Sequence, residues 1–320
     1  MRAYAIRRFL LIIPTLLIVS TLLFALIRFL PGDLISQIVA TQPFTQSGAH
    51  TYDIASLRHT LGLDKPLLQQ YFSWLGDFLR GRFGYSLWDH TTLLQNLRAK
   101  IPVTVELSLL SLIIGLAISI PLGIYSAIRQ DTWLDYIGRT LAILAMAIPS
   151  FWLATLIVAF LPIVTHTTIV LAYTPLAVNP GRNLEQFLLP AFIMGLTSAG
   201  YTIRYTRTLM LEVLRQDYVR TAWAKGLKEQ VVIMRHVVRN TMIPIVEIVG
   251  GMIPGLFGGA VIFEQIFDLP GMGRYFLDSL NKKDYLIISG WNFMFSIFVM
   301  IFIVLTDLAY AYVDPRIHYK

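Results

Sequence analysis

The chain contains no cysteine among its 320 residues, and only 14% of the residues are charged. Soluble domains carry about 25% charged residues, so this composition argues against an ordinary soluble enzyme. Without cysteine, the chain has neither a disulfide framework nor a thiolate metal site. The net charge of +7 does not indicate nucleic acid, because no interleaved basic and aromatic binding motif accompanies it.

The chain also lacks the common signatures of catalysis. No Gly-Lys dipeptide occurs, whereas a phosphate-binding P-loop needs Gly-Lys followed by Ser or Thr. The H-E-x-x-H and G-x-S-x-G motifs are missing too. The six histidines show no metal-ligand spacing; they are His50, His59, His90, His166, His236 and His318. We therefore expect no catalytic residue, no bound cofactor and no metal ion in this chain.

What the chain has in abundance is hydrophobic sequence, which makes up 56% of its residues. A membrane-spanning helix needs roughly 20 apolar residues. Six runs reach that length: 9–30, 103–128, 137–162, 187–209, 243–263 and 287–313. Prolines at 121, 149 and 254 interrupt them, which membrane helices tolerate. The predicted fold is therefore all-α, a polytopic membrane protein with six transmembrane helices.

Lysine and arginine near the helix ends predict the orientation. With the N-terminus inside, 14 basic residues fall on inside segments and 11 on outside ones, and many of the 11 lie in the long segment 31–102. We expect both termini to be cytoplasmic. The predicted organisation is an anchor helix at 1–30, an external helical segment at 31–102, a five-helix core at 103–313 and a tail at 314–320.

The most informative part of the core is the cytoplasmic loop 210–242. The spacing of its apolar residues predicts helix beyond the fourth span, and Gly226 should end that helix. Ala222, Ala224 and Gly226 are small, so another protein could approach the backbone closely there. On composition alone, a basic loop without a partner is the preferred interpretation of the segment.

The residues of this loop resemble the coupling motif of ABC importer permeases of the dipeptide/oligopeptide/nickel group, the oligopeptide/dipeptide permease B type. The loop reads Asp217-Tyr-Val-Arg-Thr-Ala-Trp-Ala-Lys-Gly226-Leu. Other matching segments follow in the same order along the chain: Leu61–Pro66, Gly81–Ser86, Pro102–Leu107, Ile148–Trp152, Glu264–Gly273, Asp284-Tyr285 and Asp314–Arg316.

The resemblance implies the ABC type I importer permease fold and a place in the bacterial inner or cytoplasmic membrane. It implies a transmembrane subunit of an ATP-driven importer for di- or oligopeptides or a similar small solute. The partners would be a homologous second permease, two ABC ATPase subunits that bind ATP and Mg, and an external solute-binding protein, all at the lipid membrane and without nucleic acid. The implied ATPase-coupling residues are Asp217, Tyr218, Arg220, Thr221, Ala222, Ala224, Lys225, Gly226 and Leu227.

Two features separate this loop from other ABC permeases. Arg220-Thr-Ala222 stands where the general motif has Glu-Ala-Ala, and Pro244 lies farther from Gly226 than in that motif. Both are typical of the peptide subgroup. Trp223 replaces the usual basic residue. Dipeptides, longer peptides, nickel chelates and oligosaccharides all remain open as solutes.

Two further sets of residues in the spans bear on function. Gly251, Gly255 and Gly259 form a small-residue face suited to close helix packing, either within the chain or against the second permease. Four charges lie near span ends: Glu106, Arg139, Glu247 and Asp307. We expect Glu106 in the first turn of its helix, where a carboxylate suits the helix dipole.

Two other classes of protein fit the composition less well. A secondary transporter or channel would favour inverted repeats or charges near the membrane midplane. An intramembrane enzyme would need a nucleophile and base, or a metal set, within the spans. Neither pattern is evident in this sequence.

Overall fold

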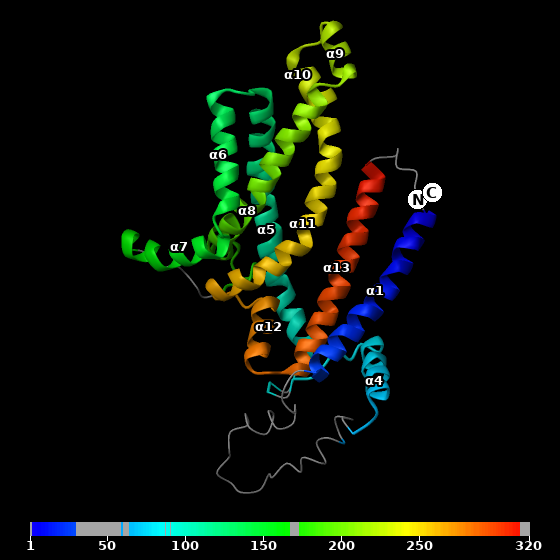
Figure 1. Ribbon diagram of the computed structural model, residues 1–320. Coiled ribbons are helices and arrows are strands. Elements are labelled where there is room, and N and C mark those ends of the chain that lie inside the picture. Colours follow the sequence, from blue (N-terminus) through cyan, green and yellow to red (C-terminus); the bar gives the residue numbers. More distant parts are fainter. Residues whose placement is uncertain are drawn as a thin grey trace. The chain divides into compact units, whose positions relative to one another are not determined.

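The computed structural model describes residues 2–29, 59, 64–86, 88, 89, 91–166 and 173–313. These residues form helices and connecting turns, with one isolated bridge between Tyr85 and Thr92 (Figure 1). The helices are α1 (Arg2–Phe29), α4 (Leu67–Leu79), α5 (Leu93–Ile128), α6 (Trp133–Ala147), α7 (Ser150–Thr165), α8 (Pro180–Leu214), α9 (Asp217–Ala224), α10 (Glu229–Val231), the π-helix η1 (Val232–Val238), α11 (Arg239–Ile266), α12 (Met272–Asn281) and α13 (Tyr285–Val313).

The predicted spans correspond to these helices. Five of the described helical stretches are long and apolar enough to cross a membrane, and the bent pair α6 and α7 counts as a sixth if it makes one crossing. The all-helical, multi-span prediction is therefore confirmed. Helix α5 begins at Leu93, before the apolar run 103–128. Glu106 consequently lies more than three turns inside α5, and its predicted place in the first turn is wrong.

The third predicted span is the least regular. The chain bends by 86° between α6 and α7. Pro149 cannot donate a backbone hydrogen bond and excludes helical geometry from the residue before it. Ile148 accordingly has φ −91° and ψ 119°, and α7 restarts at Ser150. The sequence identified the proline but not the size of the bend.

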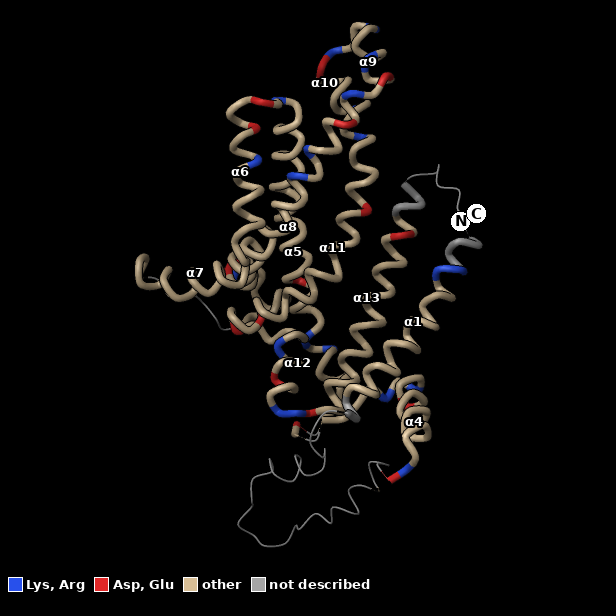
Figure 2. The backbone as a smooth tube through the Cα atoms, in the orientation of Figure 1, with Lys and Arg blue, Asp and Glu red and all other residues tan. Residues whose placement is uncertain are grey.

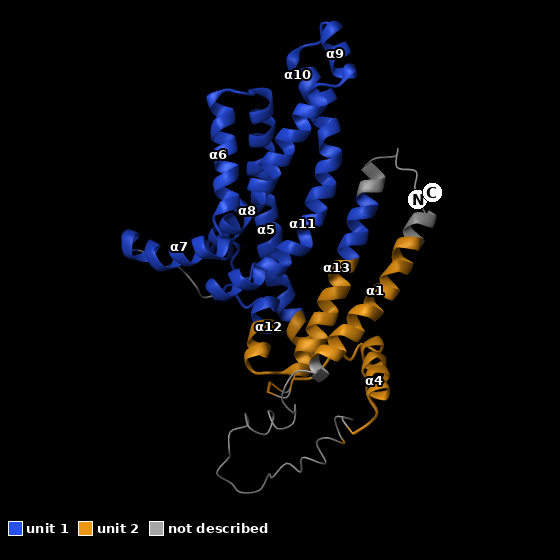
Figure 3. Cartoon of the chain, viewed as in Figure 1, with its two compact units in different colours: residues 1–6, 98–275, 301–320 blue, residues 7–97, 276–300 orange. Residues whose placement is uncertain are grey.

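The chain divides into two compact units, residues 1–6, 98–275 and 301–320, and residues 7–97 and 276–300 (Figure 3). Much of the predicted external segment 31–102 lies outside the described residues, so that assignment stays a prediction. In the second unit, α4 packs on residues of α1 and α13: Tyr71 hydrogen-bonds Ser20 at 2.9 Å, and Trp74 lies 6.1 Å from the ring of Phe293.

The first unit contains α6 to α11 with most of α5, the start of α12 and the end of α13. Its core lies where α5, α7, α8 and α11 meet. Buried members of this core include Leu107, Ala154, Phe187, Ala191 and Phe263. Glycines allow α5 and α8 to approach closely, since a methyl group added at Gly115 would lie 3.0 Å from the carbonyl oxygen of Gly195. This backbone approach is typical of membrane helix packing.

A buried carboxylate organises the turn that follows α11. Glu264 is fully buried and accepts hydrogen bonds from the Thr104 hydroxyl and, at 2.8 Å, from the Arg274 backbone N–H. The Thr104 hydroxyl in turn accepts a bond from the Met272 N–H at 2.9 Å. One side chain of α11 thereby fixes both α5 and the start of α12. The sequence singled out the motif Glu264–Gly273, but not this role.

Candidate functional site

The candidate site is the short helix α9 at the end of the first unit where α8 and α10 meet (Figure 1). Helix α8 ends at Leu214, and Gln216 leaves the helical conformation with φ −72° and ψ 147°. The Gln216 carbonyl then accepts the first bonds of α9, from Val219 at 3.0 Å and Arg220 at 3.2 Å. The break reorients the chain, so α9 is a separate eight-residue helix and not an extension of α8.

Gly226 forms the turn that follows the C-terminal end of α9. Its φ of +74° lies in the left-handed region, which residues other than glycine rarely adopt. The Gly226 N–H bonds the Trp223 carbonyl at 2.9 Å, which closes the last turn of α9. A methyl group at Gly226 would meet no atom within 4 Å among the described residues, so backbone conformation and not space selects glycine here.

The inner face of α9 packs on its own unit. Val219 and Ala222 lie three residues apart and are both buried, at 0% and 5% exposure. They belong to an apolar cluster that we call the α9 core, with Ala127, Met210, Val232, Ile233 and Val237. The expectation that Ala222 offers its backbone to another protein is therefore wrong. Its methyl group is used to attach α9 to α5, α8 and η1.

The outer face of α9 is exposed and mixes aromatic, apolar and basic side chains. Tyr218, Trp223 and Leu227 have exposures of 45%, 44% and 37%. Ala224 is exposed beside them. Exposed cations surround this face at Arg215, Arg220, Lys225 and Lys228, and Figure 2 shows basic residues at this end of the first unit. Such a surface can bury aromatic area and pair with carboxylates on a partner.

Asp217 and Arg220 form an exposed ion pair of 3.3 Å within α9. Both side chains are largely in solvent, at 95% and 73% exposure, so the pair contributes little to stability. Its carboxylate also lies in the first helical turn, where negative charge is favourable.

After α10 the chain forms a π-helix, η1, before it continues as α11. Three of its seven residues, Val232, Ile233 and Val237, point into the α9 core. π-helical turns are rare and occur mostly at functional sites. No sequence pattern indicates this π-helix, because its apolar spacing also fits an ordinary α-helix.

The glycine face of α11 has few neighbours in the described residues. A methyl group at Gly251 or Gly255 would meet no atom within 4 Å there, and one at Gly259 would lie 3.8 Å from Met194. Packing of Gly251 and Gly255 inside the described part of the chain is thus not observed. Within α11, Gly250 packs closely, because a methyl group added there would clash with the Thr306 side chain of α13.

The sequence also missed a buried ion pair near the α5–α6 turn. Asp135 of α6 is fully buried and accepts two bonds of 2.7 Å from the Arg207 guanidinium of α8. Ser126 of α5 donates to the same carboxylate. The pair joins residues 72 apart in sequence, so no local pattern could indicate it.

The described residues contain no group of three or more His, Asp or Glu side chains placed to hold a metal ion. The arrangement at α9 is an exposed surface of aromatic, apolar and basic side chains on a helix whose other face is buried. The geometry of α9 comes from three features of the chain: the break at Gln216, the buried Val219–Ala222 face and the left-handed turn at Gly226.

Two family models match the chain. Residues 119–319 match the binding-protein-dependent transport system inner membrane component, and residues 1–108 match the N-terminal part of such a membrane component. The oligopeptide transport system permease protein AppB of Bacillus subtilis is 36% identical over 100% of both chains. The dipeptide transport system permease protein DppB of Alkalihalophilus pseudofirmus is 34% identical, again over 100% of both.

A solved structure shares the fold at much lower identity. A chain of the MetNI methionine ABC transporter in an inward-facing conformation superposes with a TM-score of 0.53 and 13% identity, covering 69% of this chain and 97% of that one. The prediction of an ABC importer permease fold is confirmed. The chain belongs to the family of inner membrane components of binding-protein-dependent transport systems, and is a multi-pass permease subunit of an ATP-driven ABC importer.

Proposed function

We propose that this permease imports di- or oligopeptides, and that the outer face of α9 docks a cytoplasmic ATPase. The single observation that carries the docking proposal is the division of α9 into two faces. Val219 and Ala222 are buried in the α9 core, which leaves Tyr218, Trp223 and Leu227 exposed among cations. The relatives named as oligopeptide and dipeptide permeases support the choice of solute.

The proposed partners are a homologous second permease, two ATPase subunits that bind ATP and Mg, and an external solute-binding protein. The glycine face at Gly251, Gly255 and Gly259 is the proposed contact with the second permease, because a methyl group at the first two positions would meet no described atom within 4 Å. ATP-driven closure of the ATPases would then move α9 and bias the permease between inward- and outward-facing states.

In this proposal, both termini and α9 lie in the cytoplasm. Two exposed positions in the first unit test the topology, Val178 before α8 and Gln130 in the α5–α6 turn. Because the chain has no cysteine, Val178→Cys should react with an impermeant maleimide in intact cells. Gln130→Cys should react only after lysis. The reverse pattern would invert the proposed topology.

Two alanines of α9 give a matched test of docking. Ala224 is exposed and Ala222 is buried, only two residues away on the same helix. In the assembled transporter, Ala224→Cys should cross-link to an ATPase subunit through a short bifunctional reagent. Ala222→Cys should not react while the α9 core is intact. Cross-linking at neither position, with both variants assembled, would remove the docking proposal.

A further inference from the structure

A pocket between α6 and α8 lies outside the α9 surface and the glycine face of α11. Its volume is about 510 Å³. It is lined by Arg139, Ala142, Ile143, Met146 and Ala147 of α6 and by Ile203, Arg204, Arg207 and Thr208 of α8. Both helices belong to the same compact unit.

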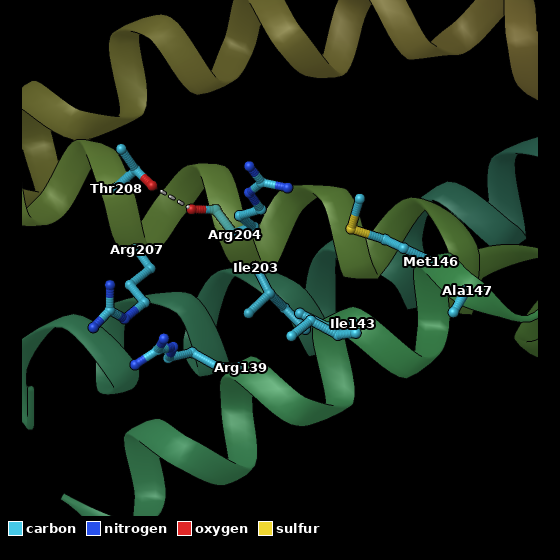
Figure 4. Close-up of a pocket in the computed structure, with 9 residues that line it drawn as sticks. Arg139, Ile143, Met146, Ala147, Ile203, Arg204, Arg207 and Thr208 are labelled. Carbon is cyan, nitrogen blue, oxygen red and sulfur yellow. Dashed lines mark hydrogen bonds between the residues drawn. The ribbon is translucent and has the colours of Figure 1, made fainter. Parts of the chain in front are cut away.

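The pocket has a basic end and an apolar end. Figure 4 shows Arg139 and Arg207 together at one end, and Met146 and Ala147 at the other. Arg139 and Met146 are seven positions apart in α6, which corresponds to about 10 Å along the helix. The pocket therefore offers positive charge followed by an apolar channel along the helix axis.

Only part of this positive charge is neutralised within the protein. Arg207 is held by the buried Asp135 through two bonds of 2.7 Å. Within the described part of the chain, neither Arg139 nor Arg204 takes part in an ion pair, and both are exposed. Arg139 lies over the Tyr136 ring at 5.7 Å. The pocket thus keeps two uncompensated guanidinium groups, whose planar donors suit phosphate oxygens.

Exposed aromatic residues mark the level of the membrane at which these arginines lie. Trp133 and Tyr136 of α6 are 68% and 54% exposed, and Tyr205 beside Arg204 is 48% exposed. Trp and Tyr gather at the headgroup level of a bilayer. Beyond them, α6 exposes Ile137, Leu141 and Ile143, as a lipid-facing helix does. On this pattern, the arginines fall at the depth expected for lipid phosphates, and the apolar end at the depth expected for acyl chains.

We propose that this pocket is a binding site for an anionic phospholipid. Arg139, beside Arg207 at the basic end, binds the phosphate, and Arg204 adds positive charge from the other side of α8. An acyl chain lies along Ile143, Met146 and Ala147. Basic pockets between transmembrane helices are suited to anionic lipid headgroups. The lipid bridges α6 and α8 and adds to the Asp135–Arg207 contact between the same two helices.

The test uses the whole transporter purified in an uncharged detergent and exchanged into nanodiscs. One set contains only dioleoylphosphatidylcholine, and the other contains equal parts of phosphatidylcholine and dioleoylphosphatidylglycerol. Thermal unfolding and native mass spectrometry measure stabilisation and retained lipid. Arg139→Gln with Arg204→Gln removes two contacts of the kind that strengthen anionic lipid binding, so we expect phosphatidylglycerol retention to fall about thirtyfold. The lysine double variant, Arg139→Lys with Arg204→Lys, should recover most of it.

Arg98→Gln with Arg182→Gln is the matched control, because it removes two exposed charges from α5 and α8 near their starts. It should retain phosphatidylglycerol like the parent protein. Three results would overturn the proposal. The first is equal retention by the Arg139/Arg204 and control variants. The second is the same thermal shift with free glycerol phosphate or a dipeptide. The third is cross-linking of Ile143→Cys to the second permease, which would mean that protein covers the pocket.

Discussion

Ala222→Asp should detach α9 from the rest of its unit, although the substitution adds only a carboxyl group. The Ala222 side chain is 5% exposed, and its neighbours Val219, Val232 and Val237 are fully buried. All members of the α9 core are apolar, so the carboxylate would have no hydrogen-bond partner among them. The new group must either be buried with a charge, be buried protonated, or pull α9 away from the core.

The free-energy cost of burying the protonated aspartate gives the size of the expected destabilisation. An ordinary aspartate has a pKa of about 3.9, so protonating it at pH 7 costs about 4 kcal/mol at 1.36 kcal/mol per pKa unit. Burying the resulting unpaired carboxylic acid adds roughly 1–3 kcal/mol. Exposing the α9 core instead sacrifices the burial of Val219 and its neighbours, at about 1.5–3 kcal/mol per large side chain. We therefore expect local opening of α9 with a loss of several kcal/mol.

Hydrogen exchange of the purified transporter measures this directly. Amides of α9 and η1 should lose protection in Ala222→Asp, while α13 should keep it because the substitution is local. Ala224→Asp is the matched control, since its side chain lies in solvent, and it should keep parental protection. Parental protection of α9 in Ala222→Asp, or equal loss in both variants, would refute the burial argument.

Three further predictions follow from single contacts. Gly226→Val should weaken ATPase co-purification because valine resists the φ of +74°, whereas Gly226→Asn should keep most of it, since asparagine tolerates this region. Gly255→Leu should reduce co-purification of the second permease without lowering thermal stability of the isolated chain, whereas Gly250→Leu should lower that stability through its clash with Thr306. Asp284 accepts a 2.7 Å hydrogen bond from Ser86, and burial raises the pKa of Asp284. Proteolysis near this contact should therefore increase as the pH rises above the usual aspartate range. Asp284→Asn should abolish this pH dependence of cleavage.

The sign of the last prediction follows from proton binding. The folded state holds the Asp284 proton at a higher pH than the unfolded state does, so stability falls as the pH rises from the ordinary aspartate pKa to the raised one. A pH-independent cleavage rate in the parent protein would contradict it. For the glycines, equal loss of partner in Gly226→Val and Gly226→Asn, or equal destabilisation by the Gly250 and Gly255 variants, would contradict the assigned causes.

The sequence predicted the helical spans and the end of α9 at Gly226, because apolar run length and glycine act locally. It could not predict which face of α9 is buried. Gln216 breaks the helix, so the register of Leu211 and Leu214 in α8 does not continue to Ala222. The start of α5 was missed because polar residues between Gln95 and Lys100 concealed helix outside the apolar run.

Long-range polar contacts were equally beyond local reasoning. The Asp135–Arg207 pair and the Thr104–Glu264 bond connect residues 72 and 160 apart. In the sequence, each of these side chains is only a charged group or a hydroxyl near the end of a span. Only the packing of α5, α6, α8 and α11 shows that they are buried partners.

The most direct test of the account is ATP-driven peptide uptake by the reconstituted transporter. Proteoliposomes should contain this chain, the second permease and both ATPases, with the solute-binding protein added outside. We expect accumulation of a labelled dipeptide or oligopeptide only when ATP is supplied on the ATPase side. Ala224→Trp should keep the complex in the membrane and lose uptake, because its bulk falls on the outer face of α9. Peptide accumulation without ATP, or undiminished uptake by Ala224→Trp, would contradict coupling through α9.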